Sequence, residues 1–208
     1  MTGLFITLEG VEGAGKSTQM AKLTAHLRES GRSVEAFREP GGTELGEKLR
    51  ALILDDTHIP MGPSAETLLL MAGRRELLDT RIRPALEAGH TVLCDRFIDS
   101  TLAYQGYARG LGEDWVRRLF ETSCGALYPQ ATLLLDLPVS EGLTRLNRPT
   151  VDRFERERGD FHEKVREGFL AIARREPGRV HLLSAAGPAD DVFQKILLCL
   201  RRHFGNAF

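Results

Sequence analysis

The sequence predicts an α/β fold in which a five-stranded parallel sheet carries helices on both faces. Three observations support this prediction: five short apolar runs, helical-period stretches that alternate with them, and a glycine-rich phosphate-binding motif directly after the first run. With 208 residues, the chain is expected to form one domain with a full core, because two independent domains would each be small.

The five expected strands are nearly continuous apolar runs, as is typical of parallel strands that are buried on both faces. They cover residues 4–8, 34–37, 91–94, 132–137 and 180–183. Helices are expected at residues 16–29, 45–54, 64–88, 113–124, 140–146, 160–174 and 189–203. In such a sheet, the loops that leave the strand carboxyl ends form the ligand crevice.

Residues 10–17 match the phosphate-binding pattern G-x-x-x-x-G-K-[ST], between the first expected strand and the first expected helix. In this motif backbone N–H groups face a phosphate, the Lys16 side chain reaches the β- and γ-phosphates, and the Ser17 hydroxyl can hold Mg²⁺. The motif therefore predicts a nucleoside triphosphate site. Its expected residues are Gly10, Val11, Glu12, Gly13, Ala14, Gly15, Lys16, Ser17 and Thr18.

A triphosphate site also needs a carboxylate for Mg²⁺, normally at the end of a strand beside the phosphate loop's own strand. Asp95 and Asp136 each end an apolar run, and position alone does not choose between them. Asp95 is favoured because Arg96 and a polar segment follow it, whereas Asp136 leads through Leu137 and Pro138 into another helix. The alternative role of Asp95 is a helix or turn cap.

Arginines gather in three segments near the expected strand carboxyl ends: Arg38, Arg74 with Arg75, and Arg96. Each alone would be interpreted as a surface charge, but together they favour an anionic second substrate, because guanidinium groups pair with phosphate oxygens. Glu9, directly before the phosphate loop, could orient a hydroxyl group or simply pair with one of these arginines.

Residues 147–159 carry many charges and few apolar anchors. Such a segment is commonly solvated and rich in ion pairs. A mobile lid that delivers an arginine to a transferring phosphoryl group is the favoured alternative, because the phosphate loop contains no arginine of its own. An acceptor that is a phosphate monoester would need no strong base, because it is mostly dianionic at neutral pH.

The composition argues against several other classes of protein. The net charge of -1 and the pI near 6.6 do not suit a dedicated nucleic-acid binder. The three cysteines are far apart and show neither a disulfide framework nor a zinc spacing. Neither a run of 18 apolar residues nor a signal-like N-terminus is found in the sequence, so a cytoplasmic protein without a membrane partner is expected.

Four sequence blocks then occur in a specific order: E-G at the start of the phosphate loop, R-E-P-G-G-T at residues 38–43, D-R at 95–96 and S-T-L-A-Y-Q-G at 100–106. With these blocks the chain resembles the thymidylate kinase family over nearly its whole length. The resemblance implies the P-loop nucleoside monophosphate kinase fold and a homodimer. It also implies a reaction in which ATP and Mg²⁺ convert dTMP to dTDP for dTTP synthesis.

The resemblance assigns roles to the matching residues. In the bacterial type that this chain resembles, an arginine of the lid, best matched by Arg153, replaces one from the phosphate loop. Catalysis would then depend on Lys16, Glu9, Arg96 and Arg153. Contacts with dTMP would come from Arg38, Arg74 and Arg96 at the phosphate, Glu9 near the sugar 3′ region, and Leu70, Thr101 and Gln105 at the base.

Two residues depart from the family's usual pattern. Leu70 stands where an aromatic ring usually stacks on thymine, and a loss of stacking would weaken dTMP binding by up to about tenfold. Phe97 stands where Tyr or His is common, which removes one polar contact. Both changes bear on acceptor affinity and selectivity more than on phosphoryl transfer.

Two other functions are compatible with parts of this pattern. A small-molecule kinase with a different monophosphate acceptor would carry the same phosphate loop. A nucleotide-dependent switch is disfavoured, because a guanine switch would be expected to carry N-K-x-D, and neither that motif nor D-x-x-G occurs in the sequence.

Overall fold

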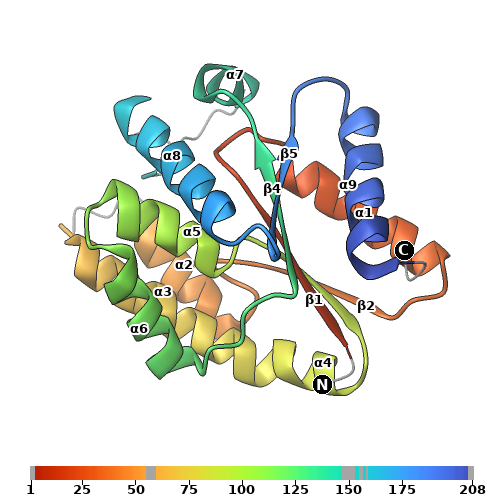
Figure 1. Cartoon of the computed structure of the whole chain (residues 1–208). Coiled ribbons are helices and arrows are strands. Elements are labelled where there is room, and N and C mark those ends of the chain that lie inside the picture. Colours follow the sequence, from red (N-terminus) through yellow and green to blue (C-terminus); the bar gives the residue numbers. More distant parts are fainter. Residues whose placement is uncertain (1–2, 55–59, 147–152, 155–156, 158, 206–208) are drawn as a thin grey trace.

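Five parallel strands form one sheet in the order β2-β3-β1-β4-β5 (Figure 1). The computed structural model describes residues 3–54, 60–146, 153–154, 157 and 159–205. The predicted sheet is confirmed, and each strand end lies within one residue of its predicted position. The strands are β1 (Leu4–Glu9), β2 (Val34–Arg38), β3 (Thr91–Asp95), β4 (Ala131–Asp136) and β5 (Val180–Ser184).

Helices occupy the seven predicted regions, and residues 98–108 add an unpredicted one. Two segments, η1 and η2, have π-helical hydrogen bonding. The helical elements are α1 (Lys16–Glu29), α2 (Glu44–Leu54), α3 (Pro63–Leu77), η1 (Leu78–Ile82), α4 (Arg83–Glu87), α5 (Ile98–Thr101), η2 (Leu102–Ala108), α6 (Glu113–Cys124), α7 (Val139–Arg145), α8 (Gly159–Arg175) and α9 (Ala189–Phe204).

Two regions differ from the prediction. The single helix expected at residues 64–88 is divided into α3, η1 and α4, and the division precedes Pro84, which has no N–H to donate to the regular helix. The helix over residues 98–108 is stabilised by tertiary packing. Ala103 of η2 is fully buried, and a Cβ at Gly168 of α8 would lie only 3.1 Å from its Cα. This close contact orders a segment that local preference does not make helical.

The sheet is covered on both faces, and alternate residues of β1 contribute to the two cores. Ile6 and Leu8 pack with α1 and α9 on one face, whereas Phe5 packs with α3, α6 and α8 on the other (Figure 1). Glu9 has the same parity as Phe5 and therefore points to the side of α8. Since both faces are covered, the loops at the strand carboxyl ends are the place for a ligand.

Candidate active site

A cleft of about 490 Å³ lies at the carboxyl ends of β1 and β3 and brings together segments that are far apart in the sequence. Most of the predicted site residues line it, whereas Glu9, Gly10, Val11 and Arg153 do not. The predicted residues that line the cleft are Glu12, Gly13, Ala14, Gly15, Lys16, Ser17, Thr18, Arg38, Leu70, Arg74, Asp95, Arg96, Thr101 and Gln105.

The phosphate loop joins β1 to α1, and its conformation requires glycine. Gly13 and Gly15 have φ angles of 72° and 87°, in the left-handed region that disfavours residues with a side chain. A Cβ at Gly13 would also lie 2.0 Å from the Gly142 carbonyl oxygen, so the loop rests directly on α7. The 14-residue helix α1 begins at Lys16 and directs its N-terminal N–H groups and the positive end of its dipole to the cleft.

Lys16 is buried against the loop that contains it. Its ammonium donates hydrogen bonds to the carbonyl oxygens of Gly10 at 3.0 Å and Val11 at 2.9 Å. Burial lowers the pKa of Lys16 to about 8, and the nearby Arg96 adds to this effect, while Glu12 opposes it. Because an adjacent anion favours the charged form of an amine, a phosphate in the cleft would raise the pKa of Lys16 again.

Ser17 and Asp95 provide the oxygen atoms that a magnesium ion would need. The Ser17 hydroxyl donates to Asp95 Oδ2 at 3.0 Å, and the buried Asp95 Oδ1 has no hydrogen-bond partner among the described residues. Asp136, the other candidate, is bound instead by Arg166 at 2.7 and 3.0 Å. Among the described residues, this site included, no group of three His, Cys, Asp or Glu side chains could hold a metal ion. Two protein oxygens suit Mg²⁺, which is usually completed by water and phosphate oxygens.

Arg96 crosses the phosphate loop from the end of β3. Its φ of 69° is rare for a residue with a side chain, and its guanidinium donates to the Gly10 carbonyl at 3.2 Å and to Glu12 Oε1 at 2.6 Å. The Tyr104 hydroxyl donates to the same Glu12 oxygen at 3.0 Å. Burial would raise the pKa of Glu12, but Arg96 and Lys16 outweigh it and lower the pKa to about 2. A charged carboxylate is therefore held beside the phosphate loop.

Arg74 of α3 lies in the part of the cleft formed by Thr101, Phe97 and Leu70. It is almost fully buried and donates to Glu39 Oε2 through Nε at 2.8 Å and Nη2 at 2.6 Å. Its Nη2 also donates to the Thr101 hydroxyl at 3.0 Å, and the Phe97 ring centroid lies 4.9 Å from its Cζ. Burial raises the pKa of Glu39, although Arg74 opposes this effect. Glu39 and Thr101 therefore hold the guanidinium in a fixed position on this wall.

Arg38 and Arg75 have different surroundings from Arg74. Arg38 lines the cleft with a half-exposed side chain that pairs with Glu47 at 2.8 Å. Arg75 lies on the outer side of α3, where it donates to Asp79 and to the Ser123 carbonyl oxygen, and it does not line the cleft. Of the two adjacent arginines in α3, Arg74 alone is therefore placed to meet a ligand in this cleft.

The predicted catalytic residue Arg153 lies away from the cleft lining. Its Nη2 is 3.0 Å from the Met61 carbonyl oxygen and 3.4 Å from Oε2 of Glu66, a buried carboxylate of α3. Gln105 of η2 donates to the other oxygen of Glu66 at 2.8 Å. Most of the predicted lid, residues 147–159, lies outside the described residues. In this arrangement Arg153 therefore pairs with α3.

Glu9 is fully buried and lies below the lining of the cleft. Its Oε1 accepts from the backbone N–H groups of Phe97 at 2.7 Å and Ser100 at 3.3 Å, and Ser100 Oγ lies 2.6 Å from its Oε2. Burial raises the pKa of Glu9 to about 8, and the neighbouring Asp99 adds to this effect. Glu9 therefore holds the segment that carries Arg96 and Thr101 in place.

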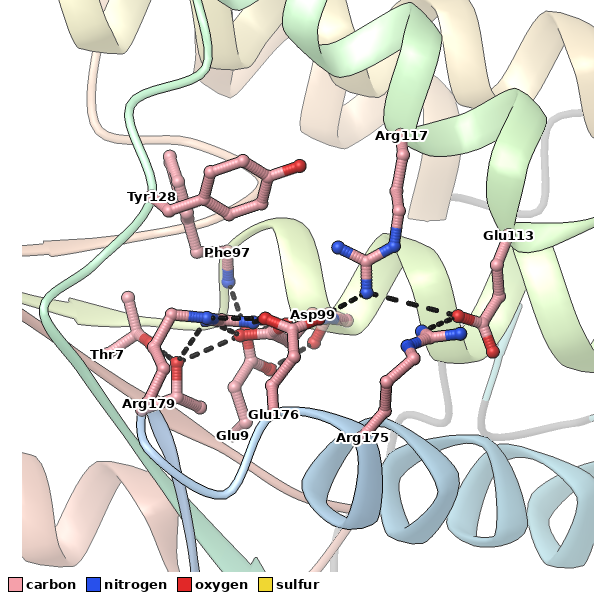
Figure 2. Close-up of polar contacts among 12 residues, drawn as sticks. Thr7, Glu9, Phe97, Asp99, Glu113, Arg117, Tyr128, Arg175, Glu176 and Arg179 are labelled. Atoms are coloured by element: carbon pink, nitrogen blue, oxygen red, sulfur yellow. Dashed lines mark hydrogen bonds and ion pairs between the residues drawn. The ribbon is translucent and has the colours of Figure 1, made fainter.

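A second group of charged residues lies behind this segment, on the side of α8 (Figure 2). Arg179 donates to both carboxylate oxygens of Asp99 at 2.7 Å. The Thr132 hydroxyl donates to Asp99 Oδ2 at 2.9 Å and lies 2.9 Å from the Thr7 hydroxyl. Glu176 binds Arg179 from the other side at 2.7 Å. This group ties α5 to β1, β4 and the end of α8.

Three functional candidates were not predicted from the sequence: Tyr104, Glu39 and Glu66. The contacts of the Glu12 carboxylate with Arg96 and Tyr104 were not predicted either. Tyr104 and Glu39 belong to the blocks A-Y-Q-G and R-E-P-G-G-T, which could have drawn attention to them. Glu66 carries no comparable signal, because its contact with Gln105 joins residues 39 positions apart. Only the packing of α3 against η2 reveals it.

Comparison with known proteins places this cleft in context. The family model described as thymidylate kinase matches residues 8–196, a range that contains the phosphate loop and every cleft segment described above. The chain belongs to the thymidylate kinase family. Curated relatives include thymidylate kinases of Alkalilimnicola ehrlichii, 49% identical over 91% of this chain and 88% of that protein, and Deinococcus radiodurans, 48% identical over 93% and 94%.

A solved structure agrees with this assignment. The crystal structure of thymidylate kinase from Ehrlichia chaffeensis matches the chain with a TM-score of 0.80 and 31% identity, and the match covers 96% of this chain and all of that one. The P-loop nucleoside monophosphate kinase fold expected from the sequence is thereby confirmed. Within the described residues, no helix combines the length and the apolar character that a membrane crossing requires.

Proposed function

We propose that this chain transfers the γ-phosphoryl group of ATP to dTMP, giving ADP and dTDP, a step in dTTP synthesis. The observation that carries this proposal is a single cleft with the phosphate loop on one side and the buried Arg74, Thr101 and Gln105 on the other. Two phosphorylated ligands in one cleft would meet end to end, and phosphoryl transfer depends mainly on such positioning and on charge neutralisation.

The donor end would use the phosphate loop. Backbone N–H groups at the start of α1 and the ammonium of Lys16 would bind the ATP phosphates, because the hydrogen bonds of Lys16 to described residues go to main-chain carbonyls. Ser17 and Asp95 would hold Mg²⁺, which neutralises phosphate charge when bound. Arg96, fixed across the loop, would lie between the two ligands.

The acceptor end would use the remaining arginines and α5. Arg74 and Arg38 would bind the dTMP phosphate with Arg96, while Leu70 would pack on the base. Glu9, which is fully buried and bound to Phe97, would support this site from below, and its place near the sugar 3′ region stays a prediction. At the surface of the cleft, Glu12 supplies a carboxylate and Tyr104 a hydroxyl group, and the two are hydrogen-bonded to each other. No general base is required, because a phosphate monoester is mostly dianionic at pH 7.

For Arg153, we retain the proposal that it acts on the transferring phosphoryl group as part of a lid. To do so, it must exchange its contact with Glu66, at 3.4 Å, for a phosphate oxygen. A doubly charged phosphate is a stronger partner for a guanidinium than a single carboxylate that Gln105 already binds. Arg145, which lines the cleft from α7, is the competing cation.

We also propose that the chain forms a homodimer. α2 and α3 pack on each other and expose Leu45 and Leu68, which are 45% and 52% exposed. Large apolar side chains exposed on neighbouring helices are candidates for a protein interface. Light scattering should give twice the chain mass, and Leu68→Glu should reduce it to the monomer mass if this surface is used.

The proposed reaction is tested by ADP release from ATP with dTMP, dUMP, UMP, CMP and GMP as acceptors, with Mg²⁺ or with EDTA. We expect the highest kcat/KM for dTMP and a loss of turnover in EDTA. A different preferred acceptor would support the alternative of another nucleoside monophosphate kinase. ATP binding without any phosphoryl acceptor would instead favour a nucleotide-dependent switch.

A further inference from the structure

Glu66 is a fully buried carboxylate of α3 for which neither the phosphate loop nor the acceptor phosphate gives a use. Its Oε1 accepts a hydrogen bond from Gln105 Nε2 at 2.8 Å. Two guanidinium groups compensate its charge: Arg153 Nη2 lies 3.4 Å from Oε2, and Arg109 Nε lies 4.0 Å from Oε1. A buried carboxylate without such partners would be strongly destabilising, so these two guanidinium groups supply what its burial requires.

The hydrogen bond to Glu66 fixes the orientation of Gln105. Glu66 Oε1 accepts in this bond, whereas an amide has a donating NH₂ on one side and an accepting oxygen on the other. The NH₂ of Gln105 must therefore face Glu66. The Gln105 oxygen then has no partner in the described part of the chain, and Gln105 lines the cleft.

We infer that Glu66 is a positioning residue that holds the Gln105 amide with its oxygen toward the base, so that the cleft selects a pyrimidine with N3–H. This inference rests on the proposed dTMP kinase function. Thymine carries a donor at N3 and an acceptor at O4. A cytosine-type ring has an acceptor at N3 and an amino group at C4. Its N3 lone pair would face the Gln105 oxygen, and two acceptors repel each other.

The test compares dTMP with 5-methyl-dCMP, which keeps the ring, the methyl group, the sugar and the phosphate and differs only at N3 and C4. Glu66→Gln makes both orientations of the Gln105 amide available. We expect kcat/KM to fall for dTMP and to rise for 5-methyl-dCMP, with the ratio reduced about tenfold or more, mainly through KM. General damage to the site would lower both values together, and that parallel loss would overturn the inference.

A double-mutant cycle shows whether Glu66 acts through Gln105. In the Gln105→Met background, Glu66→Gln should leave the substrate ratio unchanged, because no amide remains to be oriented. The matched control is Glu76→Gln, a glutamate of α3 that does not line the cleft. An equal effect of Glu66→Gln with and without Gln105 would contradict the mechanism.

If Glu66→Gln does not fold, the unsubstituted protein still provides a test. In protein with ¹⁵N-labelled glutamine, the Gln105 side-chain amide can be assigned by its loss in Gln105→Met. Its NH₂ protons should exchange with water more slowly than those of the exposed Gln194. Equal exchange rates would overturn the Glu66 contact. Failure of the unsubstituted chain to phosphorylate dTMP would contradict the proposed function instead, and this exchange measurement does not depend on that reaction.

Discussion

Two charged groups lie on opposite sides of residues 96–101, and they differ in how their charges are balanced. The internal group has three arginines and three acids that pair with one another: Arg117, Arg175, Arg179, Asp99, Glu113 and Glu176 (Figure 2). The cleft group, the described charged residues that line the cleft, includes six cations and three acids: Lys16, Arg38, Arg50, Arg74, Arg96 and Arg145, with Glu12, Glu39 and Asp95. Two of these cations also pair with acids outside the lining, Arg38 with Glu47 and Arg145 with Glu141.

The comparison distinguishes charges that stabilise the fold from charges that bind a ligand. In the internal group, both oxygens of Asp99 are bound by Arg179, so no partner is lacking. In the cleft group, Lys16 has only carbonyl partners and Asp95 Oδ1 has none among the described residues. An excess of positive charge in a concave site attracts polyanions. Substitutions in the two groups should therefore have separable effects on stability and on activity.

The largest effect is expected from Arg153→Ala, which tests whether Arg153 acts on a ligand or stabilises the fold. A mobile arginine that reaches the transferring phosphoryl group contributes about 10³-fold or more to turnover, so kcat should fall by that amount. Steady-state kinetics with the exposed Arg118→Ala as control provide the measurement. An unchanged kcat would eliminate this role for Arg153. If Arg145→Ala instead lowers kcat by about 10³-fold, Arg145 of α7 is the residue that acts on the phosphoryl group.

Lys16→Met should separate activity from stability in the cleft group. Removing a charge aimed at the ATP phosphates should lower kcat/KM by about 10²- to 10³-fold. Burial lowers the Lys16 pKa from 10.5 to about 8, so the unfolded state binds its proton more tightly between these pH values. Unfolding free energy should therefore rise with pH from 8 to 10.5 in the parent and less so in Lys16→Met.

The same variant should also unfold at a higher temperature near pH 7, because it no longer buries an ammonium. Calorimetry at several pH values measures this, with the exposed Lys48→Met as the control. A lower Tm together with lost activity would place Lys16 among the residues that stabilise the fold.

Arg179→Met tests the internal group and should have the opposite result. It leaves the Asp99 carboxylate buried without its cation, which typically destabilises by about 3–5 kcal/mol. The kcat of the folded fraction should change little. Urea unfolding and kinetics at low temperature measure the two quantities, with the exposed Arg174→Met as control. A large loss of kcat with unchanged stability would abolish the distinction between the groups.

Glu9→Gln probes the carboxylate that lies between the two groups. Burial raises the Glu9 pKa from 4.5 to about 8, so the folded state binds its proton more tightly than the unfolded state. The resulting stability is complete below pH 4.5 and is lost as the pH rises through about 8. Unfolding free energy should therefore fall less steeply over this range in Glu9→Gln than in the parent or in the exposed control Glu87→Gln. Parallel curves would contradict the pKa shift.

The smallest effect is expected from Leu70→Phe, which changes the apolar part of the cleft. An aromatic ring at this position could stack on thymine and lower KM for dTMP by up to about tenfold, with little change in kcat. The exposed Leu198→Phe serves as the control. An unchanged or raised KM would show that Leu70 does not face the base.

The sequence predicts those parts of the molecule that depend on local order. The five strands and the phosphate loop are continuous segments, so their apolar runs and glycine spacing specify them directly. Asp95 could be favoured for a similar reason, since Arg96 and a polar segment follow it directly in the sequence. Even so, β3 and β4 both flank β1, and only the Ser17 contact of Asp95 and the Arg166 pair of Asp136 distinguish them.

The tertiary structure decided which side chains reach the cleft. Glu9 and Glu12 are three residues apart and both acidic, yet strand parity buries Glu9 below Phe97 while the turn of the loop brings Glu12 to Tyr104. Glu66 meets Gln105 because α3 packs against η2, a π-helical segment that propensity does not specify. Short-range geometry follows from neighbouring residues, whereas the partner of a buried charge is chosen by the packing of distant segments.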